Sequence, residues 1–300
     1  MYQYRAFGLN IESEAPIELA SPSRFGTPDA RIRFGDLSEL RSRHGLDGED
    51  RRFLMDDEVA VLHWSSVGTV SVRDGKEIVV DPPSEVDLSL LGMALAGPPL
   101  GILLHQRGLL VLHASAVVVD DHVVAFIGHK GFGKSTTAAA LHEAGFSLFT
   151  DDILAVDPAT AQPMARPGFA QLKLWPSAAE AVFEDRAPAA EAQGDKILRP
   201  IETAYAEATL PVGAVFVLDA GDLSVDSVTG REAILEVLRN SYASRFVGTD
   251  GTPPDHLVKC TAFATAVPVL RLRRSPGLEE LTNIVDLVVQ TFRRMGSGDP

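Results

Sequence analysis

GHKGFGKS, residues 128–135, is the segment that says most about the fold of this chain. It fits the pattern G-x-x-x-x-G-K-[ST] at every position, which chance alone would produce in roughly 1% of chains of this length. Glycines let the backbone curl until successive N–H groups point inward at a phosphate, and a following helix adds its positive N-terminal end. We therefore expect nucleotide contacts from Gly128, Gly131, Phe132, Gly133, Lys134, Ser135 and Thr136.

The segments on either side of the loop support this interpretation. Val123–Ile127 is an apolar run that ends directly at Gly128, and Lys134–Ala144 has the composition of a helix that Gly145 stops. A second apolar run, Phe146–Thr150, comes next. Strand, glycine-rich turn, helix and strand together form the unit of a phosphate-binding α/β domain.

Two side chains of the loop carry the expected chemistry. Lys134 can bridge the β- and γ-phosphates of ATP, and the Ser135 hydroxyl can ligate Mg²⁺. Such a loop indicates binding of a nucleoside triphosphate, but it does not by itself indicate a particular reaction.

Acidic side chains after the next strand point to the reaction. Asp151 and Asp152 follow Phe146–Thr150 directly, at the carboxyl end of a strand, where open α/β sheets bind their ligands. One carboxylate can hold Mg²⁺ while the other accepts a proton from an attacking hydroxyl. His113 lies upstream of the loop in the apolar run Leu112–Ala116, where a histidine is ordinarily a core residue.

The order of these groups resembles a known catalytic core. His113, then the loop, then Asp151-Asp152 is the arrangement of bacterial HPr kinase/phosphorylase, and the resemblance covers Leu109–Asp157. It extends loosely through Arg166–Gly168 and Lys173–Pro176. Kinases that modify precursor peptides in lasso-peptide clusters look closest, because their N-terminal module opens much like YRAFGL at the start of this chain.

The resemblance implies an α/β fold, a P-loop kinase core of the HPr kinase/phosphoenolpyruvate-carboxykinase kind. It also implies transfer of phosphate from ATP, with Mg²⁺, to a serine hydroxyl of a peptide or small protein. The catalytic residues would be His113, Lys134, Asp151 and Asp152. Asp151 would accept the proton, Asp152 would join Ser135 at the metal, and His113 would bond the acidic pair or the transferring phosphate. The residues alone leave the order of the two aspartate roles open.

Two departures from the family bear on the substrate. HPr kinases usually carry a glutamate directly after the serine of the loop, where this chain has Thr136. The N-terminal module does not resemble the regulatory domain of the carbon-catabolite enzymes. We therefore do not expect HPr as the substrate, and the residues leave open whether a reverse phosphorylase activity exists.

The first 83 residues predict a β-rich domain. Short runs of strand-forming residues recur there, and Asp74-Gly75 between Thr69–Val72 and Ile78–Val80 is a strong hairpin signal. Ser84, with Asp87 three residues later, resembles the start of a capped helix. We place the boundary there: residues 1–83 form a domain that is a candidate for substrate recognition, and residues 84–300 form the catalytic domain.

Composition limits the other functions. A formal net charge of −14 argues against a nucleic-acid partner, and the single Cys260 excludes an internal disulfide. No apolar segment follows the N-terminus. Leu88–Leu104 is uncharged, but it is short for a membrane span and Pro98-Pro99 interrupts it, so two buried helices are expected. We expect a cytoplasmic protein without a membrane partner, and the sequence leaves open whether it forms a homo-oligomer.

Three readings of the function remain at this stage. The leading one is a serine kinase acting on a peptide or small protein. The second is a kinase of a small hydroxyl metabolite, and the third is a non-catalytic ATP-binding regulator, for which a proton acceptor would have no use. Lys196, Arg199 and Arg245 are weaker candidates for a cation at the transferring phosphate.

Overall fold

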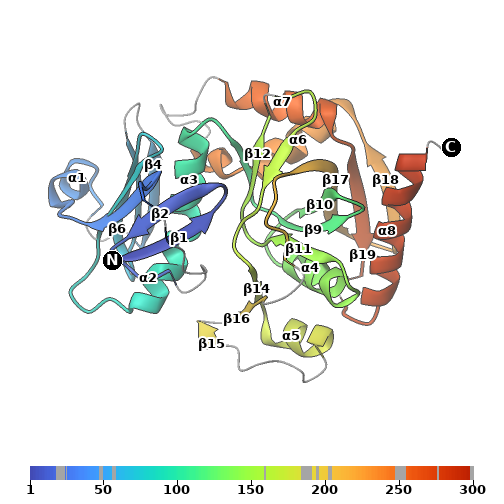
Figure 1. Ribbon diagram of the computed structural model, residues 1–300, viewed down its shortest axis with the longest axis horizontal. Helices are drawn as coiled ribbons and strands as arrows, with labels where there is room; N and C mark the ends of the chain where they lie inside the picture. Colours follow the sequence, from blue (N-terminus) through green and yellow to red (C-terminus); the bar gives the residue numbers. More distant parts are fainter. Residues whose placement is uncertain are drawn as a thin grey trace. The chain divides into compact units, whose positions relative to one another are not determined.

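The computed structural model describes residues 1–17, 24, 26–46, 50–55, 59–158, 160–183, 191–193, 196–201, 205–246, 255–275 and 277–297. The chain divides into two compact units, Met1–Val111 with Ser241–His256, and Leu112–Asn240 with Leu257–Pro300. Both units contain β-sheet and helices, so the architecture is mixed α/β with several sheets (Figure 1).

The first unit is built on a seven-stranded sheet with the order β1-β2-β3-β7-β6-β5-β4. Its strands are β1 (Tyr2–Ala6), β2 (Leu9–Ser13), β3 (Ala30–Phe34), β4 (Arg51–Met55), β5 (Val59–Trp64), β6 (Gly68–Arg73) and β7 (Glu77–Asp81). Its helices are α1 (Ser38–Arg43), α2 (Leu88–Leu95), α3 (Pro98–Gln106) and the 3₁₀ turn η1 (Tyr242–Phe246).

The predicted hairpin in this unit is confirmed. β6 and β7 pair antiparallel, with Arg73 opposite Glu77 at the turn. Asp74 and Gly75 both have positive φ, +57° and +60°, as tight hairpin turns require. A side chain at Gly75 would also lie 2.6 Å from Cγ of Arg107, so this position needs glycine for space as well as for conformation.

The start of α2 differs from the expectation. The sequence suggests that the helix begins at Ser84 with Asp87 inside its first turn, whereas α2 begins at Leu88. Asp87 is the N-cap, and its carboxylate accepts the backbone N–H of Ser89 at 2.8 Å and of Leu90 at 3.4 Å. A carboxylate at the N-cap satisfies two amides that the helix cannot pair internally, which explains the later start.

The helices α2 and α3 lie in the first unit. Gln106, the last residue of α3, accepts the N–H of Gly75 at 2.9 Å and donates to the carbonyl of Val72 at 3.1 Å. These bonds tie α3 to the hairpin of the first sheet. The chain consequently divides after Val111, whereas the sequence analysis places a boundary at residue 83.

The same two helices are strongly apolar. Leu88–Gln106 is the one stretch in the described chain that is long and apolar enough to cross a membrane, with a mean hydropathy of 1.6. Two thirds of it is nevertheless buried inside the protein, as the core helices of globular domains are. Two short buried helices, as the sequence predicts, account for this stretch.

The second unit carries most of the remaining elements. Its strands are β9 (Ser115–Val119), β10 (His122–Ile127), β11 (Ser147–Thr150), β12 (Leu154–Asp157), β13 (Met164–Arg166), β14 (Gln171–Leu174), β15 (Glu191–Gln193), β16 (Lys196–Pro200), β17 (Leu210–Ala220), β18 (Ser224–Val228) and β19 (Val269–Arg274). Its helices are α4 (Lys134–Glu143), α5 (Pro176–Phe183), α6 (Gly230–Arg239), α7 (His256–Ala266), whose first residue belongs to the first unit, and α8 (Leu281–Ser297). β8 (Leu110–Leu112) runs from the first unit into the second.

The central sheet of this unit has parallel strands β10, β17 and β19, with β9 and β11 on one side and β18 on the other. Every second residue of the central strands enters one core cluster with α4 and α8, as the period of a strand requires. The residues concerned are Val124, Phe126, Ala214, Phe216, Leu218, Leu270 and Leu272.

The opposite face of the sheet is covered by α6. Arg271, between two of the buried leucines of β19, donates to Glu232 at 2.8 Å and to Glu236 at 2.9 Å, both in α6. It also donates to Asp219 of β17 at 3.0 Å. Burial lowers the pKa of Arg271, but these hydrogen bonds and the charges of Glu236 and Asp219 raise it by more, so this partly buried cation is paired.

Two breaks between elements lie at the site. The apolar run 109–119 forms β8 and β9, with His113 and Ala114 between them. The helix α6 ends at Arg239, and η1 follows in the first unit. Asn240 lies at this break, and its carbonyl accepts the N–H of His113 at 2.7 Å.

Candidate functional site

The loop after β10 has the curled backbone that a phosphate needs. Gly128, Gly131 and Gly133 all have positive φ, at +139°, +91° and +87°. A Cβ at Gly128 would lie 2.9 Å from the carbonyl oxygen of Leu218, and a Cβ at Gly133 would lie 2.9 Å from Nη1 of Arg274. Both positions therefore exclude larger residues, and α4 begins directly after the loop, with its free amides facing it.

Lys134 is a buried cation that lies against the loop. Its side chain is in the first turn of α4 and the residue is 7% exposed. Nζ donates to the carbonyls of Gly128 at 2.9 Å and His129 at 3.3 Å. Burial lowers the pKa of Lys134, and the charges of Asp152 and Asp151 only partly offset this. Among the described residues it has no ion-pair partner, so an incoming phosphate would supply the missing negative charge.

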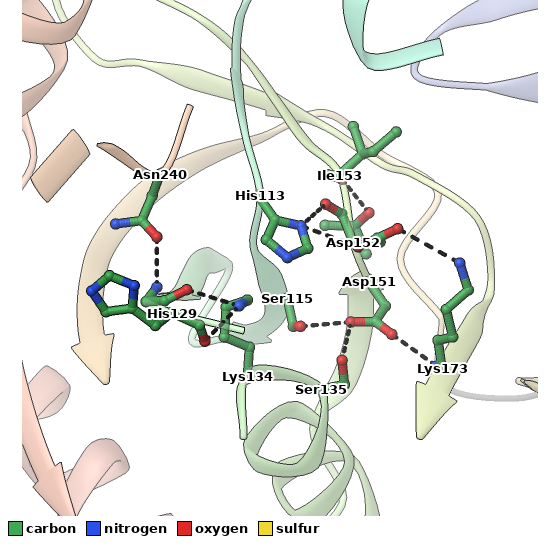
Figure 2. A network of polar contacts seen from close by, with 12 residues as sticks. His113, Ser115, His129, Lys134, Ser135, Asp151, Asp152, Ile153, Lys173 and Asn240 are labelled. Atoms are coloured by element: carbon green, nitrogen blue, oxygen red, sulfur yellow. Dashed lines mark hydrogen bonds and ion pairs between the residues drawn. The ribbon is translucent and has the colours of Figure 1, made fainter. Parts of the chain in front are cut away.

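Asp151, directly after β11, is fixed by three donors. Its Oδ1 accepts hydrogen bonds from the hydroxyls of Ser135 at 2.9 Å and Ser115 at 2.5 Å. Its Oδ2 accepts the backbone N–H of Lys173 at 2.8 Å. Figure 2 shows the two hydroxyls meeting at one oxygen of the carboxylate. Asp151 therefore joins the end of β11 to the first turn of α4, the strand β9 and the strand β14.

Asp152 is held differently from its neighbour. Its backbone is left-handed, with φ +74°, and its side chain is 31% exposed. Nδ1 of His113 lies 3.1 Å from both Oδ1 and the carbonyl oxygen of Asp152. Nζ of Lys173 lies 3.6 Å from Oδ2, and His113 and Lys173 approach from opposite sides (Figure 2).

Electrostatics keeps Asp152 ionised. Burial raises the pKa of this carboxyl, but the hydrogen bond from His113 and the positive charges of Lys173, His113 and Lys196 lower it by more. The net effect is a pKa well below the usual range of an aspartate. At neutral pH the site therefore presents a charged carboxylate with a histidine on one of its oxygens.

These groups converge on one pocket. It is lined by the loop and the first turn of α4, by the acidic pair, by His113 and Ser115, and by Lys173–Trp175 and Lys196. Four lysines face two aspartates there, so the lining favours an anion. Its volume of about 80 Å³ is far below the roughly 300–1,000 Å³ of pockets that enclose a whole ligand. The pocket suits phosphate groups and a reacting hydroxyl, with the rest of each substrate outside.

Asn240 fastens the loop to the segment between β8 and β9 that carries the histidine. Its Oδ1 accepts the N–H of Gly128 at 2.9 Å, and its backbone carbonyl accepts the N–H of His113. Nδ2 donates to the carbonyl of Glu236, in the last turn of α6, at 2.9 Å. One residue at the end of α6 thus sets the position of the first glycine of the loop and of His113 together.

The oxygen groups around Asp151 fit Mg²⁺. Magnesium prefers hard oxygen ligands and typically keeps water and phosphate in its shell, needing only one or two groups from the protein. The Ser135 hydroxyl and Oδ1 of Asp151 are 2.9 Å apart and both line the pocket. Elsewhere in the described chain no three His, Cys, Asp or Glu side chains gather as an all-protein metal site would require.

Most of the candidate residues predicted from the sequence line this pocket. His113, Gly131, Gly133, Lys134, Ser135, Thr136, Asp151 and Asp152 all line the pocket. Gly128 forms the base of the loop, while Phe132 packs beside the core with its ring 5.8 Å from that of His129. Of the weaker candidates, Lys196 lines the pocket and Arg199 instead stacks on Phe183 at 3.5 Å. Arg245 lies in η1, and its side chain is outside the described part of the chain.

Three polar residues of the site were not singled out from the sequence. Ser115 is two residues after His113, and this spacing could have indicated it, since alternate residues of a strand share a face. Lys173 reaches both aspartates from β14, and Asn240 reaches the loop from α6. No local pattern marks these two, because their roles arise only from contacts made by the folded chain.

Comparison with known proteins finds similar chains among solved structures. No family model matches this chain, and no curated protein matches it. Among solved structures, the chain is similar to the HPr(Ser) kinase/phosphatase from Coxiella burnetii. The match covers 63% of this chain and 99% of that one, with 13% sequence identity and a TM-score of 0.35. A likeness this distant does not assign a reaction, for which the residues of the site are the guide.

Proposed function

We propose that this protein is an ATP-dependent kinase that transfers the γ-phosphate to a hydroxyl group, using Mg²⁺. The observation that supports it most is the meeting of three kinds of group in one pocket. A buried lysine lies on a glycine-rich loop, a carboxylate shares a hydrogen bond with the loop serine, and a second, ionised carboxylate contacts a histidine. A protein that only bound a nucleotide would need the first two kinds and not the third.

The nucleotide end of the pocket follows from the loop. The β-phosphate would lie in the curl of the loop, where backbone amides and the start of α4 face it. Lys134 would exchange its two carbonyl partners for oxygens of the β- and γ-phosphates. Ser135 and Asp151 would hold Mg²⁺, which supplies charge neutralisation at the same phosphates.

At the other end, Asp152 would accept the proton. The hydroxyl oxygen of the acceptor forms a bond to the γ-phosphorus while the bond to the bridging oxygen breaks, and that electron pair leaves with ADP. The hydroxyl proton passes to the carboxylate of Asp152, which His113 and Lys173 hold in place. Lys173 and Lys134 also carry positive charge to balance that of the transferring group.

These roles reverse the order that the family resemblance implies. Asp151 shares its Oδ1 with the metal-binding hydroxyl of Ser135 and has a donor on each oxygen, which suits a metal-side group. Asp152 has His113 at Oδ1 and Lys173 near Oδ2. Geometry therefore favours Asp151 at the metal and Asp152 at the acceptor.

We propose a serine of a peptide or small protein as the acceptor, as in the kinases of lasso-peptide precursors. The small size of the pocket supports this choice, since it admits a hydroxyl and leaves the body of the acceptor outside. A small hydroxyl metabolite would require an enclosed space for recognition on several sides.

The full-length protein, Mg²⁺ and [γ-³²P]ATP, incubated with a pool of serine-containing peptides, tests the proposal. We expect label on peptide, in the acid-stable form of a phosphoserine. Label that appears only on small hydroxyl compounds would favour the metabolite kinase. Tight ATP binding with no label on any acceptor would contradict the kinase and favour an ATP-binding regulator.

A further inference from the structure

Trp175 is an exposed aromatic residue at the mouth of the phosphate pocket. It is 41% exposed, although large aromatic side chains are usually buried, and it lines the pocket. Its backbone is fixed, because it directly precedes Pro176 and its carbonyl accepts the N–H groups of Ala178 and Ala179 at 3.0 Å each. The ring is therefore displayed by a rigid junction between β14 and α5.

Lys196 stands beside this ring. Leu174 pairs with Ile197 in the antiparallel ladder of β14 and β16, so Trp175 and Lys196 occupy the next rung. Nζ of Lys196 lies 5.7 Å from the centre of the indole, in cation–π range. The charge of Lys196 lowers the pKa of both Asp152 and Lys134, so Lys196 lies close to the reacting groups.

The pair lies at the acceptor end of the pocket. Lys173 and Trp175 are two residues apart on an extended segment, and their side chains therefore share a face, about 7 Å apart. Nζ of Lys173 contacts Asp152, the proposed proton acceptor, and not the loop that would hold the β-phosphate. In the proposed function the nucleoside would lie at the far end of the triphosphate from this carboxylate. A molecule on Trp175 would thus be the acceptor.

We propose that Trp175 and Lys196 form the acceptor subsite, and that it takes a peptide with an anionic group and an apolar surface next to the phosphorylated serine. The inference rests on the proposed kinase function. The apolar part of the acceptor packs on the free area of the indole, and its carboxylate pairs with Lys196. The net charge of −14 makes this local positive group selective, because acidic acceptors have few other places to bind.

Synthetic peptides of the form Ala-Ala-X-Ser-X-Phe-Ala, with X as Glu, Gln or Lys, test this with [γ-³²P]ATP and the full-length protein. Glycerate serves as a small anionic hydroxyl compound. We expect the Glu peptide to have a KM about tenfold below that of the Lys peptide, as one charged pair would produce. Lys196→Glu should invert the preference, and Lys76→Glu, on the exposed β6–β7 turn of the first unit, should leave it unchanged.

The variant Trp175→Ala shows whether Trp175 binds the acceptor or the nucleoside. The subsite predicts a rise of about tenfold in the peptide KM, with the KM for ATP unchanged. A rise in the KM for ATP alone would place the base of the nucleotide on Trp175 and overturn the proposal. A charge preference that Lys196→Glu does not alter would overturn it as well, and so would phosphorylation of glycerate in place of every peptide.

A binding measurement keeps the subsite testable if no phosphate is transferred. The chain has two tryptophans, so Trp64→Phe leaves Trp175 as the single tryptophan, whose emission can be excited apart from that of the tyrosines. The Glu peptide should shift its emission, and neither the Lys peptide nor the Lys196→Glu variant should show the shift. Binding without transfer would contradict the kinase and support the subsite. Transfer without charge preference would support the kinase and contradict the subsite. No shift and no preference would overturn the subsite.

Discussion

The hydroxyl of Ser135 donates to Oδ1 of Asp151 across 2.9 Å, which joins the first turn of α4 to the end of β11. These residues are separated by a whole helix and a strand in the sequence. Their contact places an oxygen from the phosphate loop next to an oxygen from the acidic pair, which is the arrangement that a shared Mg²⁺ needs. The roles proposed for the site depend on this contact.

Removing the loop hydroxyl tests the metal site. Ser135→Ala should raise the Mg²⁺ concentration required for ATP binding by about tenfold, because one of two protein ligands is lost. Its melting temperature should stay close to that of the wild type, since a partly exposed hydroxyl contributes little to folding. Ser135→Thr, which keeps the hydroxyl, is the matched control. An unchanged Mg²⁺ requirement in the alanine variant would exclude Ser135 as a ligand.

Lys134 should matter for binding and not for folding. A buried ammonium without an ion-pair partner in the described structure carries a desolvation cost, so Lys134→Met should melt no lower than the wild type without nucleotide. With Mg²⁺ and ATP, the wild type should be stabilised and the variant should not, because binding to the native state raises its stability. Thermal unfolding with and without nucleotide measures both effects. Equal stabilisation of the two proteins would contradict the assignment of the loop.

Asn240 should position the loop through one hydrogen bond. Asn240→Ala leaves the N–H of Gly128 without its acceptor and should raise the KM for ATP severalfold, as loss of about 1 kcal/mol implies. Asn283→Ala, on the exposed face of α8, is the control and should change nothing. If the two variants bind ATP equally well, Asn240 has no part in holding the loop.

The charge of Asp152 should make stability depend on pH. Its folded pKa lies below the unfolded value of about 3.9, so ionised Asp152 stabilises the fold above that pH. This contribution should disappear as the pH falls through 4 towards the folded pKa. Asn tolerates the left-handed backbone of this position, so Asp152→Asn isolates the charge.

Denaturant unfolding of wild type and Asp152→Asn between pH 3 and 7 measures this dependence. The difference in unfolding free energy should be largest near neutral pH and should shrink in acid. A difference that stays constant, or that grows as the pH falls, would mean that the positive groups around Asp152 do not stabilise its charge.

Local patterns in the sequence predicted many of the residues that line the pocket. The loop glycines, Lys134 and Ser135 are close together in the chain. Asp151 follows the next strand, and its carboxylate accepts the hydroxyl of Ser135. The hairpin at Asp74-Gly75 is likewise a local signal, and the structure confirms it. Such features depend on backbone conformations that a few residue types favour, so the residue types indicate them.

Contacts between distant segments could not be predicted from local sequence patterns. The end of α6 at Arg239 has no glycine or proline to mark it, and Asn240, which follows, bonds both the last turn of the helix and the loop. The ionised state of Asp152 depends on Lys173 and Lys196, which come from β14 and β16. The division after Val111 depends on how Gln106 packs on the first sheet. Each is a tertiary effect that overrides local pattern.

Phosphate transfer by Asp151→Asn and Asp152→Asn, measured beside the affinity for Mg²⁺ and ATP, decides between the two assignments of the aspartates. Asp152→Asn should bind Mg²⁺ and ATP as the wild type does, while transfer to a serine peptide falls by about 10²-fold or more, as loss of the proton acceptor implies. Asp151→Asn should lose affinity for Mg²⁺ and ATP together with transfer. The reverse pattern would identify Asp151 as the proton acceptor, and full transfer by both variants would contradict the kinase.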